Sequence, residues 1–183
     1  MIKQWIIRWW ARHDRPREFT FPGDLQQARR VLVMMPTDIE AMRQSEFFLA
    51  RLPQAFPKAK VSLLYPPKSL APRFYNPYGF AAVVPTSSHV GWWGMPRRPF
   101  LNELFHEPYD VLISLNKELT VFHAVVAVAS QTPVRIGLPD GMGHPFVTVE
   151  LRHGRVAADV KTEFILFVEM IRKLAATPSP TAV

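Results

Sequence analysis

The sequence contains no cysteine. This absence excludes disulfide bonds, thiolate nucleophiles and every metal site built on cysteine, and it fits a reducing compartment. No apolar run approaches the roughly 20 residues that a membrane-spanning helix needs. The N-terminus is also a poor secretory signal, because Arg8 interrupts its apolar run and no small-residue cleavage site follows. We therefore predict a cytoplasmic protein.

The sequence also lacks the short motifs that mark common catalytic and nucleotide sites. The predicted first strand, residues 31–35, runs into MPTDIEA without a glycine, so the G-x-G-x-x-G fingerprint of a dinucleotide site is absent. Walker A, HExxH and GxSxG sequences are absent as well. The six histidines are scattered without the spacing of metal ligands. We therefore predict no cofactor and no metal.

What is present indicates one globular domain with a basic head. The chain has 183 residues, of which 48% are hydrophobic and 20% charged, enough for a substantial core. The net charge of +7 indicates an anionic partner, either nucleic acid, a phospholipid surface or a phosphorylated small molecule. Residues 1–17 hold five cationic residues against one acidic residue, a net +4, so over half of the excess lies there.

Short apolar runs alternate with helical patterns along the rest of the chain. The predicted strands are residues 31–35, 60–65, 80–84, 109–115, 133–138 and 146–152. The predicted helices are residues 39–52, 100–106, 118–131 and 161–175. This alternation favours a single α/β domain, a Rossmann-like, doubly wound and mostly parallel sheet. We predict four regions: an amphipathic helix (1–13), a linker (14–29), the Rossmann-like domain (30–175) and a disordered tail (176–183).

Polar residues follow several predicted strands. In doubly wound sheets, ligands bind beyond the carboxyl ends of the strands, where the strand order reverses. The candidates for ligand binding at this edge are Thr37, Asp38, Ser88, His89, Asn116, Lys117, Asp140 and His144. Structural roles compete with this interpretation: Asp38 also suits a helix cap, Lys117 a solvated loop, and His123 a hydrogen-bonded position in the core.

Two stretches resemble glycosyltransferase family 9, the heptosyltransferases of lipopolysaccharide core assembly. The family opens with a strand that leads through a Gly-Asp turn to a helix ending in R-x-x-F-P-x-A-x-[IV]. The first stretch of this chain resembles that opening and reads RVLVMMPTDIEAMRQSEFFLARLPQAFPKAKVSLLY. Its counterpart of the helix ending is LPQAFPKAKV, residues 52–61. The second stretch, residues 103–138, resembles a family segment in which YDLVIDLQ is followed by a helix and then by APVRIG. In this chain it reads ELFHEPYDVLISLNKELTVFHAVVAVASQTPVRIGL. The resemblance spans roughly residues 30–140 and implies one half of the two-domain GT-B architecture.

The resemblance also bears on catalysis. Aligned on AFPKAKV without gaps, Glu40 and Ala41 stand where the family has Gly-Asp, whose aspartate is the base toward the acceptor hydroxyl. Ala41 cannot replace it, which leaves Asp38 and Glu40 as catalytic candidates. The family's nucleotide-sugar donor is held mainly by a C-terminal domain for which this chain has no room. We therefore predict a non-catalytic, acceptor-side half-domain that acts as a binding or assembly subunit.

An enzymatic alternative remains open. In it, the chain is a glycosyltransferase whose donor-binding half is another chain, and Asn116 and Lys117 position a lipid or polysaccharide acceptor. Either interpretation admits a sugar-phosphate or lipid-linked ligand. A second alternative is the binding of RNA or single-stranded DNA through the head and the tryptophan-rich segment of residues 86–99.

The head has the pattern of an interfacial helix. Its apolar face holds Ile2, Trp5, Ile6, Trp9 and Trp10, and its cations are Lys3, Arg8 and Arg12. Indoles lie at headgroup depth and cations meet anionic lipid, so we predict a peripheral position at the inner face of the membrane. Docking on a partner protein and packing on the chain's own domain are the alternatives. Residues 86–99 are predicted as a loop, whose tryptophans form a second interfacial contact, a lid or simple packing.

Overall fold

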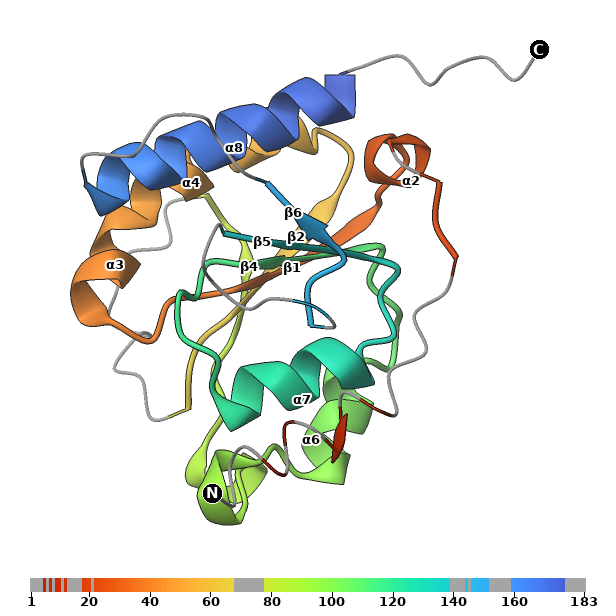
Figure 1. Ribbon diagram of the computed structural model, residues 1–183, viewed down its shortest axis with the longest axis vertical. Helices are drawn as coiled ribbons and strands as arrows, with labels where there is room; N and C mark the ends of the chain where they lie inside the picture. The colour runs from red at the N-terminus through yellow and green to blue at the C-terminus, as the bar shows by residue number, and fades with distance from the viewer. Residues whose placement is uncertain are drawn as a thin grey trace.

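The computed structural model describes residues 5, 7, 9, 10, 12, 18–20, 22–67, 78–138, 144, 146–151 and 159–176. Its centre is a parallel sheet of six strands in the order β3-β2-β1-β4-β5-β6 (Figure 1). The strands are β1 (Arg30–Met34), β2 (Lys60–Leu64), β3 (Ala81–Val83), β4 (Val111–Ser114), β5 (Val134–Gly137) and β6 (Val149–Glu150). This order is that of a Rossmann-like, doubly wound sheet, and the predicted fold class is confirmed.

One face of the sheet is covered by helices from both halves of the chain (Figure 1). They are α2 (Gly23–Gln26), α3 (Ile39–Gln44), α4 (Glu46–Leu49), α5 (Leu52–Ala55) and α8 (Val160–Ala176). The buried residues Phe164, Phe167, Val168 and Ile171 recur at helical spacing and form the inner face of α8. Phe167 stacks on Phe48 of α4 at 5.8 Å between ring centroids. This packing joins the last helix to the first half of the fold.

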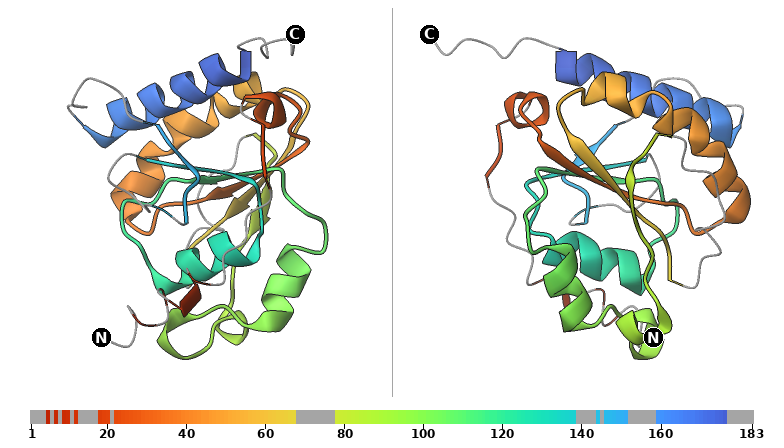
Figure 2. Two further views of the ribbon diagram at one scale, coloured as in Figure 1. Left: turned by 45° about the vertical axis from the view of Figure 1, so that its right-hand side comes forward. Right: turned by 180° about the vertical axis from the view of Figure 1, so that it is seen from behind.

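The opposite face is covered by α6 (Arg98–Leu104) and α7 (Val121–Ala129), so helices flank the sheet on both sides (Figure 2). Residues 121–128 of α7 are all buried, as its continuous apolar sequence predicts. The described head residues are helical, and Ile7 and Trp10 pack against this layer. The segment between β3 and α6 contains two short 3-10 helices, η2 (Ser87–His89) and η3 (Trp92–Gly94).

Two predicted elements differ from the structure. The single helix expected over residues 39–52 is three short helices, because the Ser45 hydroxyl donates to the Met42 carbonyl at 2.6 Å and Pro53 starts a new first turn in α5. Of the strand expected over residues 146–152, the described part forms the short β6, in which Val149 and Glu150 pair with Ile136 and Gly137 of β5. The preceding Phe146 and Val147 instead fill the core beneath α7.

The segment predicted as a linker contributes to the fold. It contains α2, and Leu25 and Ala28 are buried in the same core as α8. At the other end, α8 continues to Ala176, and the remainder of the predicted tail lies outside the described residues. Within the described part of the chain, none of the helices combines the length and the apolar character required to span a membrane.

Candidate functional site

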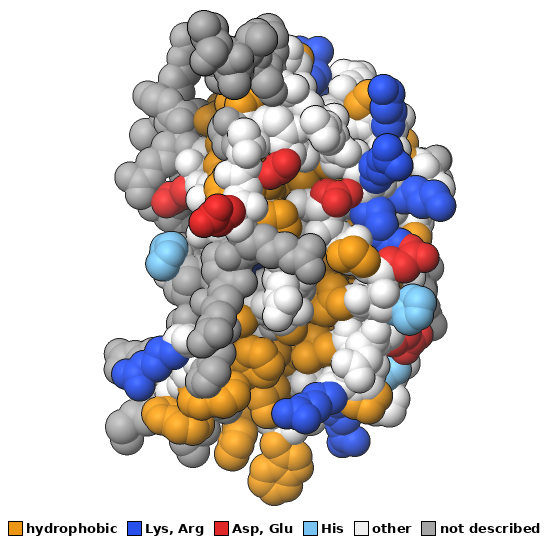
Figure 3. Space-filling view, turned by 90° about the vertical axis from the view of Figure 1, so that its right-hand side faces the viewer, with side chains coloured by type: hydrophobic (Ala, Val, Ile, Leu, Met, Phe, Trp, Pro, Cys, Tyr) orange, Lys and Arg blue, Asp and Glu red, His pale blue; other side chains and the backbone are white. Residues whose placement is uncertain are grey.

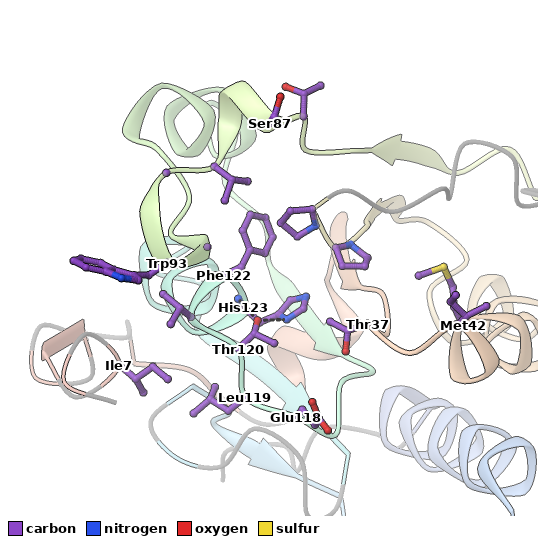
Figure 4. Close-up of a pocket in the computed structure, with 18 residues that line it drawn as sticks. Ile7, Thr37, Met42, Ser87, Trp93, Glu118, Leu119, Thr120, Phe122 and His123 are labelled. Atoms are coloured by element: carbon purple, nitrogen blue, oxygen red, sulfur yellow. Dashed lines mark hydrogen bonds between the residues drawn. The ribbon is translucent and has the colours of Figure 1, made fainter. Parts of the chain in front are cut away.

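A cavity of about 1060 Å³ lies beyond the carboxyl ends of the strands (Figure 4). Thr37 follows β1, Pro66 follows β2, and Glu118 and Thr120 follow β4, so three strand ends meet at the cavity. Because β1 and β4 are neighbours whose connections leave in opposite directions, this is the point where the strand order reverses. The predicted location of a ligand site therefore coincides with a cavity.

A smaller cavity of about 460 Å³ adjoins the first, and Thr37 and Glu118 line both. Its other described lining residues include Asp38, Asn116 and Lys117. Four of the predicted site residues therefore lie around one cavity, and Thr37 connects it with the larger one. The tertiary structure brings together the residues after β1 and β4, which are about 80 positions apart in the sequence.

Asn116 organises the junction between β1 and β4. Its side chain is buried, and its Nδ2 donates to the carbonyls of Met34 and Met35 at 3.3 and 3.0 Å. Its Oδ1 accepts from the Thr37 backbone N–H at 3.1 Å. The side-chain amide thus bonds to three backbone groups, and through the bond to the Thr37 N–H it positions Thr37.

The two carboxylates considered for catalysis are engaged within α3. Asp38 caps the helix, because its Oδ1 accepts from the Ala41 backbone N–H at 2.8 Å. Glu40 is exposed, and its Oε1 accepts from Gln44 Nε2 at 2.8 Å. Asp38 lines the smaller cavity, whereas Glu40 lines neither. The cap interpretation of Asp38 is confirmed.

Lys117 lies in the loop after β4 and its side chain is 52% exposed, as the loop interpretation expected, but it also makes an ion pair. Its Nζ lies 2.5 Å from Glu163 Oε2 of α8, whose side chain is only 10% exposed. The ion pair gives a partner to a carboxylate that burial removes from water. Lys117 therefore binds the last helix to the loop after β4.

Three other predicted site residues line neither of these two cavities. Ser88 and Thr86 share a hydroxyl hydrogen bond of 2.7 Å. His89 Nδ1 accepts from the Thr86 backbone N–H, its ring stacks on Phe100 at 5.1 Å, and it lines a separate cavity near β3. His144 is exposed and lines neither cavity, and Asp140 lies outside the described residues.

His123 is the cavity residue that sequence reasoning assigned to the core. Its Nδ1 lies 2.7 Å from Thr120 Oγ1, and in Figure 4 the ring lies between Thr120 and Thr37. The side chain is fully buried, and burial lowers its pKa to about 4, so the imidazole is neutral at neutral pH. Its Nε2 has no hydrogen-bond partner among the described residues. The core prediction is confirmed, but not the expectation of a fully hydrogen-bonded ring.

The mouth of the large cavity is flanked by tryptophan-bearing segments. Ile7 of the head and Trp93 of η3 both line it. In these two segments, Trp5, Trp9, Trp92 and Trp93 are 66%, 44%, 83% and 50% exposed. Figure 3 shows hydrophobic side chains gathered at this lower end of the molecule, with basic side chains beside them. Ile2, Lys3, Ile6 and Arg8 of the predicted apolar and basic faces lie outside the described residues.

The lining of the large cavity combines hydroxyl groups with apolar surface. Thr37, Thr86, Ser87 and Thr120 supply the hydroxyls, beside Phe122, Leu119 and two prolines. Among the lining residues that the structure describes, Glu118 is the only charged one. Such a lining suits an uncharged, amphiphilic group better than a phosphate, which would meet a carboxylate and no cation.

The comparisons with known proteins identify the fold. Neither the scan against protein-family models nor the search of the curated proteins finds a match. Among solved structures, the glycosyl transferase family 9 protein of Veillonella parvula DSM 2008 is similar with a TM-score of 0.52 and 19% identity, over 86% of this chain and 43% of that one. The E. coli heptosyltransferase WaaC, solved with ADP, is similar with a TM-score of 0.54 and 16% identity, over 84% and 49%. The chain thus has their fold, as the resemblance implied, and spans about half their length.

Proposed function

We propose that the chain is a non-catalytic binding module that works at a membrane surface and has a glycosyltransferase-like fold. The observation that carries this proposal is the exposure of Trp5 and Trp9 in the head, whose Ile7 lines the strand-end cavity. Ile7 and Trp10 from the same head pack on the domain. The head is therefore attached to the body on one side and offers indoles on the other, as an interfacial anchor requires.

The charge of the chain supports a membrane as the partner. The net charge is +7, and Arg12 in the head is exposed. Each basic residue near an anionic leaflet contributes roughly 1 kcal/mol. A lipid-linked or other amphiphilic ligand fits both this location and the cavity lining, which combines hydroxyl groups and apolar surface with one carboxylate and no cation among the described residues. It is the ligand class that we favour over a sugar phosphate.

The engagement of the candidate bases supports a non-catalytic role. A general base must reach the hydroxyl proton that it removes, and Asp38 instead holds the first turn of α3. Glu40 is exposed, and its carboxylate accepts a hydrogen bond from Gln44 of the same helix. Ala41, at the position that corresponds to the family's aspartate, has no ionisable group.

Vesicle flotation tests the membrane proposal. The intact chain is expected to float with vesicles containing phosphatidylglycerol and much less with pure phosphatidylcholine. The variant Trp5→Ser/Trp9→Ser, whose substituted side chains are exposed, should keep its fold but lose most of this binding. Equal flotation of the variant and the intact chain would refute the head as an anchor. If the intact chain does not float, partner-protein docking replaces the membrane proposal.

The variants Asp38→Asn and Asp38→Ala separate a cap from a catalytic base. Asparagine caps helices about as well as aspartate, so Asp38→Asn should leave the unfolding free energy nearly unchanged, whereas Asp38→Ala should lower it by about 1 kcal/mol. No turnover of a nucleotide sugar is expected from the intact chain or from either variant. Detection of ADP-sugar turnover by the chain, lost in Asp38→Asn, would establish the transferase alternative.

A further inference from the structure

All five tryptophans of the chain lie in two segments, the head and the tip of the loop before α6. The head accounts for Trp5, Trp9 and Trp10, and the loop for Trp92 and Trp93. Trp92 is 83% exposed, the highest value among the large hydrophobic residues that the structure describes. The proposed function uses only the head, so the exposed pair in the loop needs its own explanation.

The loop is an ordered hairpin rather than an irregular connection. Its two sides are joined by the Arg97 N–H donating to the His89 carbonyl at 2.9 Å and the Gly91 N–H donating to the Met95 carbonyl at 2.7 Å. Between these bonds, Val90 and Pro96 form an antiparallel bridge. We call residues 89–97 the tryptophan hairpin. Its tip is held in one shape, which reduces the conformational entropy lost on binding.

The base of the tryptophan hairpin is packed on the domain, while its tip is strained and exposed. Val90 and Met95 contact the core beneath α7. At the tip, Trp93 has φ = 59°, a left-handed conformation that costs a residue other than glycine roughly 1–2 kcal/mol. Strain of this kind is retained at functional sites. Here it holds a half-exposed indole at the mouth of the cavity.

Two cations accompany the hairpin. Arg97 and Arg98 follow its tip and are exposed. The exposed indoles and cations of the hairpin thus repeat the chemistry of the head, which combines Trp5 and Trp9 with Arg12. Trp93 and Ile7 both line the large cavity, and Figure 4 shows them toward the same side of it.

We infer that the tryptophan hairpin is a second membrane-inserting element, which works with the head so that the mouth of the strand-end cavity faces an anionic phospholipid surface. The inference rests on the proposed function, because the head brings the chain to the membrane. Two contacts fix the orientation of the domain, whereas one helix alone would leave it free to rotate. The cavity then receives its ligand directly from the lipid surface.

Site-specific labelling tests the insertion. The chain has no cysteine, so Trp92→Cys can be labelled at a single position with an environment-sensitive fluorophore while the head stays intact. Tyr78→Cys is the matched control, because Tyr78 is also exposed but precedes β3. It therefore lies at the amino ends of the strands, whereas the cavity lies beyond their carboxyl ends. The probe is a vesicle of phosphatidylglycerol and phosphatidylcholine with brominated acyl chains.

On vesicles, the label at position 92 should shift its emission to shorter wavelength and be quenched by the brominated chains, and the label at position 78 should do neither. Independently, Trp92→Ser/Trp93→Ser should lower vesicle affinity about tenfold or more without lowering Tm. Flotation of a chain whose position-92 label is unquenched would overturn the inference and leave the proposed function standing. A chain that does not float at all would refute both.

Discussion

At the scale of single residues, Asn116 shows how a polar side chain can organise a site through hydrogen bonds within the protein. Its amide joins the end of β1 to the end of β4 through three backbone groups. The order of the residues suggested a ligand contact, since Asn116 follows the clearest apolar run of the chain. In the tertiary structure the side chain bonds to its neighbours, because the Met35 carbonyl and the Thr37 N–H need a partner at this junction.

Asn116→Ala should therefore destabilise the fold. The variant removes the Asn116 hydrogen bonds to the Met35 carbonyl and the Thr37 N–H, whereas the Met34 carbonyl keeps the Leu115 N–H as a donor; the cost is about 2–3 kcal/mol in the free energy of unfolding. Urea unfolding followed by circular dichroism measures the loss. Glu118→Ala, an exposed substitution two residues away, should change stability by less than about 0.5 kcal/mol. Equal losses in the two variants would contradict this role of Asn116.

His123 makes the stability of the fold depend on pH. Its pKa is lowered to about 4 in the folded chain from 6.5, so between these values the unfolded chain binds a proton that the folded chain does not. Stability is therefore complete above about pH 6.5 and falls by roughly 3 kcal/mol as the pH drops toward 4. In denaturant unfolding at a series of pH values, His123→Phe should lack this component, whereas the exposed His144→Phe should retain it. A parallel pH dependence in His123→Phe and the intact chain would contradict the assignment.

At the scale of elements, the packing of β5 depends on a glycine. A Cβ built on Gly137 would lie 2.6 Å from Cγ2 of Val147, which is buried beneath α7. Valine is stiff about its first side-chain torsion, so it cannot move aside cheaply. The short β6 and the residues before it can approach β5 closely only because position 137 lacks a side chain.

Gly137→Ala should consequently lower the free energy of unfolding by about 1–3 kcal/mol. Adding Val147→Ala gives the new methyl group room, so the double variant should lose about 1 kcal/mol less than the sum of the two single losses. Chemical denaturation of the four chains of the cycle gives the coupling energy. As a control, Gly91→Ala places its Cβ 3.5 Å from the nearest atom and should be well tolerated. Strictly additive losses would show that Gly137 and Val147 do not interfere.

Element boundaries show where local patterns were insufficient. The apolar periodicity over residues 39–52 indicated one helix, but hydroxyl competition at Ser45 and the proline at position 53 divide it. By contrast, α7 and α8 follow their predictions closely, because long runs with one consistent pattern bury a continuous surface. The tryptophan hairpin was predicted as a loop, and its cross-strand hydrogen bonds became visible only in the folded chain.

At the scale of the whole molecule, charge and exposed indoles act together. Charge attraction to a lipid surface is screened by salt, whereas burial of an indole is not. The binding of single-stranded nucleic acid, the remaining alternative for the basic head, would depend much more steeply on salt because it releases condensed counterions. The salt dependence therefore discriminates between these two partners.

Raising the salt concentration from about 50 mM to about 500 mM should weaken the binding of the chain to phosphatidylglycerol vesicles but not abolish it. Sedimentation of the vesicles with bound protein measures the affinity at each salt concentration. Binding to a single-stranded oligonucleotide, measured by fluorescence anisotropy, should be weak throughout. Tight oligonucleotide binding that disappears steeply with salt would favour the nucleic-acid alternative instead.

The sequence by itself determined the fold class, most of its elements and the edge of the sheet at which a cavity forms. It did so because apolar runs and helical periodicity record which surfaces each segment buries. Only the tertiary structure decided which polar side chains remain available there: Asn116 and Lys117 are used by strand ends and by α8, Asp38 by its own helix. It also decided that Ile7 and Trp93, which are far apart in the sequence, line one cavity. A hydrogen bond or an ion pair depends on distances between segments far apart in the chain, and no local pattern contains those distances.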